Sequence, residues 1–193
     1  MSQDPATAQT LPDLVARAAA RYGDRPAITD GDLRLSYGDL DAARLQAARA
    51  FMAAGIGKGD RVLVFQPMSY ALYVVLLAIF RLGGVAMFLD PSAGRAHIEQ
   101  CCEIGAPRAL VASTRAHLLR FVSAHLRRIP KQFVVGPFAP GATSLRRADW
   151  LAPLEDITSC AAEDPALLTF TSGSTARPKA ALRSHAFLLA QHQ

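Results

Sequence analysis

Cysteine is scarce in this sequence, and its positions form no metal-binding pattern. Among 193 residues there are three cysteines, with Cys101 and Cys102 adjacent and Cys160 far from both. The sequence has no Cys-x-x-Cys pair and no Cys/His set at zinc-ligand spacing. An odd number of cysteines without such a pattern is typical of a reduced compartment. The sequence therefore predicts a cytoplasmic protein without a structural metal site.

The sequence also lacks an uninterrupted apolar run long enough to cross a bilayer. Its longest apolar stretch, Met68 to Leu89, contains Arg81 and the pair Gly83-Gly84, which favours a buried helix followed by a buried strand. The first ten residues have neither the basic start nor the apolar core of a secretory signal. We therefore expect no export and no membrane span.

Acidic residues are absent from Ile104 to Ala148, although eight Lys and Arg residues occur there. This segment carries +8, and because the whole chain carries +5, the remainder carries −3. Such a segment forms either a solvated helix face or a docking surface for a phosphate-bearing or acidic partner. No nucleic-acid-binding module accompanies it, so we do not expect nucleic acid to bind.

Apolar residues make up 51% of the chain and charged residues only 19%, which predicts a real hydrophobic core. Apolar bursts alternate with helical patterns, as in a βαβ chain, and predict a three-layer α/β fold with a mainly parallel sheet. The expected strands are Pro26 to Thr29, Arg34 to Ser36, Arg61 to Phe65, Val85 to Leu89, Arg108 to Ala112, Gln132 to Val135 and Ala166 to Thr171.

Several helix boundaries are legible in the sequence. Ser36 and Asp39 have the spacing of a capping box at the start of a long helix, and the glycines from Gly55 to Gly59 end it. Crossover helices are expected at residues 69–81 and 94–104. Residues 135–164 read as a surface excursion, and residues 184–193 as the beginning of a helix.

A loop rich in hydroxyl groups follows the last expected strand. Thr171, Ser172, Gly173, Ser174 and Thr175 are small enough for backbone N–H groups to approach phosphate oxygens, and Lys179 adds a positive charge. A Walker loop does not fit, because proline precedes the lysine and alanine follows it. The residues alone leave two interpretations open, a phosphate-binding loop and a polar turn between two strands.

The stretch Phe170 to Lys179, with His185 six residues later, resembles the Ser/Thr/Gly-rich signature of the adenylate-forming superfamily. That superfamily includes acyl-CoA synthetases, peptide-synthetase adenylation domains and insect luciferases. Leu35 to Leu40 and Arg81 to Pro91 resemble two further motifs of the same superfamily, in the same order. The sequence departs from the pattern at three positions, with alanine in place of the usual glycine at 176 and 180 and phenylalanine in place of proline at 88.

The resemblance implies that residues 1–193 are the N-terminal portion of an AMP-binding domain, with the C-terminal domain absent. It implies a ligase that joins a fatty or other hydrophobic carboxylic acid to AMP from ATP, with Mg²⁺ held outside this chain. Coenzyme A, or an acyl carrier protein, would then accept the acyl group. The residues implied to bind the triphosphate are Thr171, Ser172, Gly173, Ser174, Thr175, Arg177 and Lys179, and Lys179 is also the catalytic candidate.

The resemblance has further implications for the activity of the fragment and for His185. Because the ribose, magnesium and carboxylate sites of the superfamily lie beyond the region matched, the 193-residue chain alone is expected to be inactive. The alternative to an enzyme is a non-catalytic fragment, or an interaction or nucleotide-binding module without turnover. His185 fits the signature, but a histidine at the start of a helix is expected to be structural.

Overall fold

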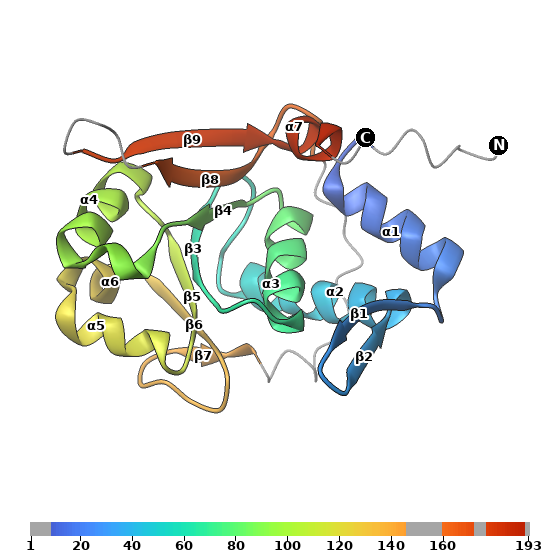
Figure 1. Cartoon of the computed structure of the whole chain (residues 1–193), viewed down its shortest axis with the longest axis horizontal. Coiled ribbons are helices and arrows are strands. Elements are labelled where there is room, and N and C mark those ends of the chain that lie inside the picture. The colour runs from blue at the N-terminus through green and yellow to red at the C-terminus, as the bar shows by residue number, and fades with distance from the viewer. Residues whose placement is uncertain (1–8, 146–159, 172–176, 192–193) are drawn as a thin grey trace.

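The computed structural model describes residues 9–145, 160–171 and 177–191, and within them one mixed sheet forms the centre of the molecule (Figure 1). Its strand order is β7-β6-β5-β3-β4-β8-β9, and all neighbouring strands are parallel except β8 and β9. The strands are β3 (Arg61–Phe65), β4 (Val85–Phe88), β5 (Ala109–Ser113), β6 (Lys131–Val135), β7 (Thr143–Ser144), β8 (Pro165–Thr171) and β9 (Lys179–Ser184). The predicted α/β fold with a mainly parallel sheet is confirmed.

Helices cover both faces of this sheet, which gives the expected three layers. One core cluster joins alternate residues of the central strands to α2 and α3, and a second joins the intervening residues to α4 and α6. The helices are α1 (Leu11–Tyr22), α2 (Tyr37–Ala53), α3 (Tyr70–Arg81), α4 (Arg95–Gly105), α5 (Leu119–Val122), α6 (Ala124–Arg128) and α7 (His185–Ala190). Figure 1 shows α4, α5 and α6 together at the left of the molecule, with α1, α2 and α3 to the right.

The predicted capping box starts α2. The Asp39 backbone N–H donates to Ser36 Oγ at 3.1 Å, and the Ser36 backbone N–H donates to Asp39 Oδ2 at 3.1 Å. These bonds satisfy donors that a helix N-terminus would otherwise leave without partners. The helix ends at Ala53, and Gly55 follows with a φ of +83°, a conformation that glycine adopts without steric cost. Both predicted ends of this helix are therefore confirmed.

The crossover helices α3 and α4 begin and end within a residue of their predicted bounds. A separate antiparallel hairpin consists of β1 (Pro26–Asp30) and β2 (Leu33–Ser36), both of which were expected as strands. Among the described elements, the helices α1, α5 and α6, the short strand β7 and the edge strand β9 were not predicted. Residues 146–159 of the expected surface excursion, and residues 192–193 of the last helix, lie outside the described residues.

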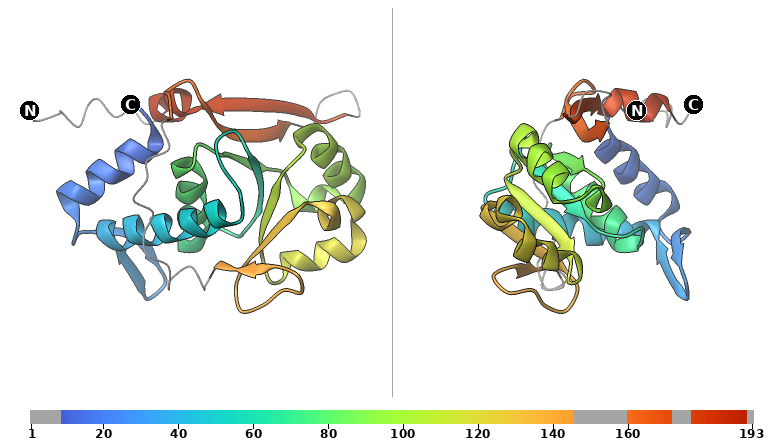
Figure 2. Two further views of the ribbon diagram at one scale, coloured as in Figure 1. Left: turned by 180° about the vertical axis from the view of Figure 1, so that it is seen from behind. Right: turned by 60° about the vertical axis from the view of Figure 1, so that its left-hand side comes forward.

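The hairpin of β8 and β9 runs along one edge of the molecule, at the top of the front and rear views (Figures 1 and 2). It ends in α7, which begins at His185 and contacts α1. Among the described helices, none has the length and apolarity needed to cross a bilayer.

Candidate functional site at the carboxyl edge of the sheet

The carboxyl ends of β3, β4 and β5 meet at a point where the chain changes direction in the sheet. The connection after β3 contains α3 on one face, whereas the connections after β4 and β5 contain α4 and α6 on the other face. Ligands of open α/β sheets bind in the crevice that such a reversal leaves at the carboxyl ends of the strands. The topology alone therefore marks this edge as the candidate site.

A cavity of about 310 Å³ occupies this crevice. It is lined by Val64, Phe65, Gln66, Pro67, Phe88, Leu89, Ser113 and Ala116, which come from the ends of all three strands and the connections after them. The lining is mainly apolar, as is usual for small-molecule sites. Phe88, which the sequence analysis noted as a departure at a strand end, also packs against the core cluster on the α2 and α3 side.

Gln66 lines this cavity together with Ser113, and neither polar side chain was singled out from the sequence. The side chain of Gln66 has an unusual environment. Its Nε2 donates to Ser69 Oγ at 3.2 Å, while its Oε1 is buried without a hydrogen-bond partner among the described residues. A buried amide oxygen without a partner is costly, and it can accept from a ligand. The signal in the sequence was its position directly after the predicted strand 61–65, because side chains just beyond parallel strands reach the ligand-binding edge.

The hydroxyl-rich loop begins and ends at the same edge. Strands β4 and β8 are parallel, and Phe88 pairs with Thr169, so Thr171 at the end of β8 lies at the same edge of the sheet as the strand ends that line the cavity. In β8 and β9, which are antiparallel, Thr171 pairs with Lys179. The loop therefore leaves and re-enters the sheet at adjacent positions, and a positive charge lies directly across from its first threonine.

The structure places three of the seven predicted site residues. Thr171, Arg177 and Lys179 are all exposed, and Pro178 between them is buried. Ser172, Gly173, Ser174 and Thr175, together with Ala176, lie outside the described residues. Ala180, the other departure at a glycine position, pairs with Phe170 within the β8–β9 ladder.

The β8–β9 pair is held by side chains as well as by its backbone ladder. Arg183 of β9 donates from Nη1 to Thr169 Oγ1 at 2.7 Å, and its guanidinium lies 5.9 Å from the ring centre of Phe187. Charge-assisted hydrogen bonds of this kind are stronger than neutral ones. Arg183 therefore helps to fix the strand that carries Lys179.

His185, which was expected to be structural, is fully buried at the start of α7. Its ring packs edge-on against Phe80 at 5.8 Å, and neither ring nitrogen has a hydrogen-bond partner among the described residues. Burial lowers the pKa of His185, an effect that the carboxylate of Asp164 partly opposes. Asp164 itself pairs with Lys58 at 2.7 Å, which holds the start of β8 against the rest of the sheet.

Two buried histidines, His117 and His185, predict a loss of stability in mild acid. Burial also lowers the pKa of His117, so both histidines titrate below the value of about 6.5 for an unfolded histidine. As pH falls below about 6.5, the unfolded state binds protons first, and the free energy of unfolding decreases by at most about 1.4 kcal/mol per pH unit for each such proton. We expect His185→Phe to reduce this decrease between about pH 7 and pH 5.5, measured by urea unfolding. If the free energy of unfolding of the variant fell with pH as steeply as that of the wild type, His185 would not be a source of the decrease.

The described residues contain no group of three or more His, Cys, Asp or Glu side chains that could hold a metal ion. The carboxylate nearest in sequence to the carboxyl end of β4, Asp90, accepts from the backbone N–H of Ser92 at 2.8 Å and from Ser92 Oγ at 2.7 Å. These hydrogen bonds lower the pKa of Asp90. Asp90 therefore serves as the cap of the turn at residues 91–93.

Comparison with known proteins identifies the family. The family model of the AMP-binding enzymes matches residues 15–193. The chain is 32% identical to an olefin beta-lactone synthetase of Stenotrophomonas maltophilia over 98% of its own length and 35% of that protein. It is also 32% identical to a 3-hydroxybenzoate–CoA ligase of an Aromatoleum species, over 89% of this chain and 33% of the ligase.

A solved structure supports the fold. The anthranilate CoA ligase AuaEII, in complex with anthranoyl-AMP, superposes with a TM-score of 0.83 at 18% identity, over 91% of this chain and 35% of that one. The chain belongs to the AMP-binding, adenylate-forming ligase family and corresponds to the N-terminal portion of the family's domain. It spans about a third of the length of the two relatives named above.

Proposed function

We propose that this chain is the N-terminal portion of an AMP-forming ligase that activates a hydrophobic carboxylic acid. In the first step, a carboxylate oxygen attacks the α-phosphorus of ATP and displaces pyrophosphate, which gives an acyl-adenylate. In the second step, a thiol attacks the acyl carbon and AMP leaves. A fatty or other hydrophobic acid, with coenzyme A or an acyl carrier protein as the acceptor, is the form of the reaction we propose for this protein.

The observation that carries the proposal is the pairing of Thr171 with Lys179 at the carboxyl edge of the sheet. We propose that Ser172, Ser174 and Thr175, with the backbone of Gly173, hold the β- and γ-phosphates. Lys179 neutralises them as pyrophosphate leaves, with Thr171 and Arg177 in supporting parts. Phosphoryl transfer depends mainly on positioning and charge neutralisation, and these are the contributions such a loop can make.

The magnesium ion that the family implies does not fit the described residues, because they offer no cluster of carboxylates. We therefore assign it no step here and propose that its ligand lies outside these 193 residues. The adjoining cavity, with its apolar lining and the unpaired Oε1 of Gln66, is the part of this chain available to a bound organic group. We also propose that the protein acts in the cytoplasm.

Carboxylate-dependent exchange of pyrophosphate into ATP tests this function. We expect the complete protein to catalyse exchange with at least one acid from a panel of short, medium and long fatty acids and aromatic acids. The isolated 193-residue chain is expected to catalyse none, because it spans only about a third of its relatives. If the purified and folded complete protein catalysed no exchange with any acid of the panel, the result would favour the alternative of an interaction or nucleotide-binding module. Clear exchange by the isolated chain would refute the prediction for the fragment.

The nature of the acceptor is a separate test. The complete protein, given a good acid and ATP, is incubated with coenzyme A or with a carrier protein bearing phosphopantetheine, and the thioester is detected by mass. Formation of the thioester with coenzyme A supports the acyl-CoA form of the reaction. Exchange without a thioester on either acceptor would limit the proposal to adenylation.

A further inference from the structure

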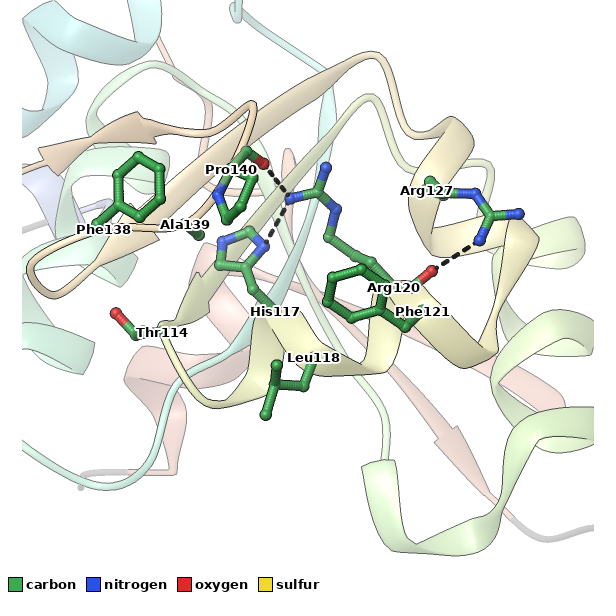
Figure 3. A pocket seen from close by; sticks show the side chains of 9 residues that line it. All are labelled: Thr114, His117, Leu118, Arg120, Phe121, Arg127, Phe138, Ala139 and Pro140. Atoms are coloured by element: carbon green, nitrogen blue, oxygen red, sulfur yellow. Dashed lines mark hydrogen bonds between the residues drawn. The ribbon is translucent and has the colours of Figure 1, made fainter.

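A second cavity, of about 300 Å³, lies beyond the carboxyl ends of β5 and β6 (Figure 3). One wall is formed by the short helix η3 (Ala116–Leu118) and by α5, and the other by the connection from β6 to β7 at residues 136–142. It is lined by Thr114, His117, Leu118, Arg120, Phe121, Arg127, Phe138, Ala139 and Pro140. None of these residues belongs to the hydroxyl-rich loop or to the cavity beside it.

Large apolar side chains at the rim of this cavity are turned toward solvent. Phe121 is 73% exposed, Phe138 67% and Leu118 62%, and Val122 beside Phe121 is 55% exposed. Scattered apolar side chains on a surface need no explanation, but a contiguous group of them marks an interaction site. Aromatic residues in particular are enriched in protein interfaces.

Side-chain hydrogen bonds hold the walls of the cavity in place. His117 is buried, and its Nε2 lies 2.9 Å from the carbonyl oxygen of Phe133, which can only accept. Nε2 therefore carries the proton, and Nδ1 is free to accept from Nη1 of Arg120 at 3.4 Å. The lowered pKa of His117 agrees with this neutral form.

Arg120 then connects the two walls. Its Nη1 donates to the carbonyl oxygen of Pro140 at 2.9 Å, while its Nε is buried without a hydrogen-bond partner among the described residues. Arg127 donates to the carbonyl oxygen of Arg120 at 3.2 Å (Figure 3). A cavity held in this way is preorganised, so that a partner loses less entropy in ordering it.

The charge around the cavity is positive. Arg115, Arg127 and Arg128 are exposed on the same short segment, and the sequence contains no acidic residue from position 104 to 148. No carboxylate is among the described residues that line the cavity, and Glu99 and Glu103 of the neighbouring α4 lie against His125. Charge complementarity therefore calls for an acidic partner.

We propose that this cavity and its cationic rim are a docking site for an acidic protein segment that inserts one large apolar side chain between Phe121 and Phe138. The volume lies at the lower end of the ~300–1,000 Å³ range of small-molecule pockets, which suits a single anchoring side chain. Because this surface is hollow and preformed, it suits a protein partner that inserts a side chain better than it suits the flat surface of a lipid bilayer. Anchors of this kind dominate the energetics of protein interfaces. The inference is independent of the adenylation chemistry.

A peptide selection tests this proposal. A displayed library of random 12-residue peptides is panned against the complete protein, so that any surface covered in that protein is excluded. The expected winners contain Phe, Trp or Leu flanked by Asp or Glu. For the most enriched peptide, measured by fluorescence anisotropy, Phe121→Ser and Arg127→Glu are each expected to weaken binding at least about tenfold. The effect of Arg127→Glu should be smaller at high salt.

Two variants on the distant β1–β2 hairpin serve as matched controls. Leu33→Ser removes an exposed apolar side chain, and Arg34→Glu reverses an exposed charge, and neither should change the affinity. Failure to select any peptide, selection of peptides without acidic residues, or unchanged binding by Phe121→Ser would each overturn the proposal. Binding to phosphatidylcholine–phosphatidylserine vesicles that both test variants abolish would overturn it in favour of a membrane surface.

Discussion

If the complete protein has the proposed activity, Lys179→Ala is expected to lower the efficiency of adenylation by roughly ten- to a hundredfold. The substitution removes a cation that the β8–β9 register places opposite Thr171, at the end of the proposed triphosphate loop. A charge-assisted contact that is partly desolvated contributes about 1.5–3 kcal/mol, and each ~1.4 kcal/mol corresponds to a factor of ten. Strand β9 pairs through its backbone, so alanine leaves the ladder intact.

The second half-reaction separates a binding role from a folding role for Lys179. When acyl-adenylate is supplied directly, no triphosphate is present, and thioester formation should decrease much less. Lys131→Ala is the matched control, because Lys131 is also the first residue of a strand, at the opposite end of the parallel sheet from the loop. An equal decrease in both half-reactions, or no decrease in either, would show that Lys179 does not neutralise the polyphosphate.

Phe51→Ala is expected to destabilise the fold by about 3–5 kcal/mol, which is the usual cost of removing a buried aromatic side chain. Phe51 of α2 is fully buried and packs edge-on against Phe133 of β6 at 4.9 Å. It therefore joins an early helix to β6, the strand next to one edge of the sheet. For a domain of this size the decrease corresponds to a shift of roughly 10 °C in the midpoint of thermal unfolding.

The neighbouring Met52→Ala is the matched control for Phe51→Ala. Met52 is 41% exposed on the same helix, and substitutions at such positions usually change stability by no more than about 0.5 kcal/mol. Urea unfolding measures the free energy of unfolding of both variants. The slope of that free energy against urea concentration should be the same for each variant and the wild type. Similar shifts for the two variants would show that the contact with Phe133 is not central to the core.

Elements with local signals were predictable from the sequence, and elements that depend on distant partners were not. The capping box at Ser36 and Asp39 acts within one turn, so the start of α2 could be read directly. Strand β9 has the sequence Lys-Ala-Ala-Leu-Arg-Ser, whose alanines and leucine favour a helix, and pairing with β8 overrides that preference. By contrast, α1 has a legible start, with Thr10 as its cap and a proline in its first turn, and could have been predicted.

The same distinction applies to the candidate site. The hydroxyl-rich loop is contiguous in the sequence, so its residues and the lysine that follows could be identified without coordinates. The adjacent cavity could not, because Gln66, Phe88 and Ser113 belong to three different strand ends. Only the strand order, in which β3 lies between β5 and β4, brings them together.

The position of β8 in the sheet also has a consequence for the order of folding during synthesis. Ala86 of β4 pairs with Leu167 of β8, which is 81 positions later in the chain, so the ribosome makes β3 to β7 before β8 exists. Until then one edge of β4 has unpaired backbone groups beside an apolar sequence, a combination that promotes association with other chains. Pairings between such distant segments also form slowly. The nascent chain is thus most vulnerable to aggregation in the interval before β8 joins β4, and the strand that ends this interval is the one that leads into the candidate phosphate loop.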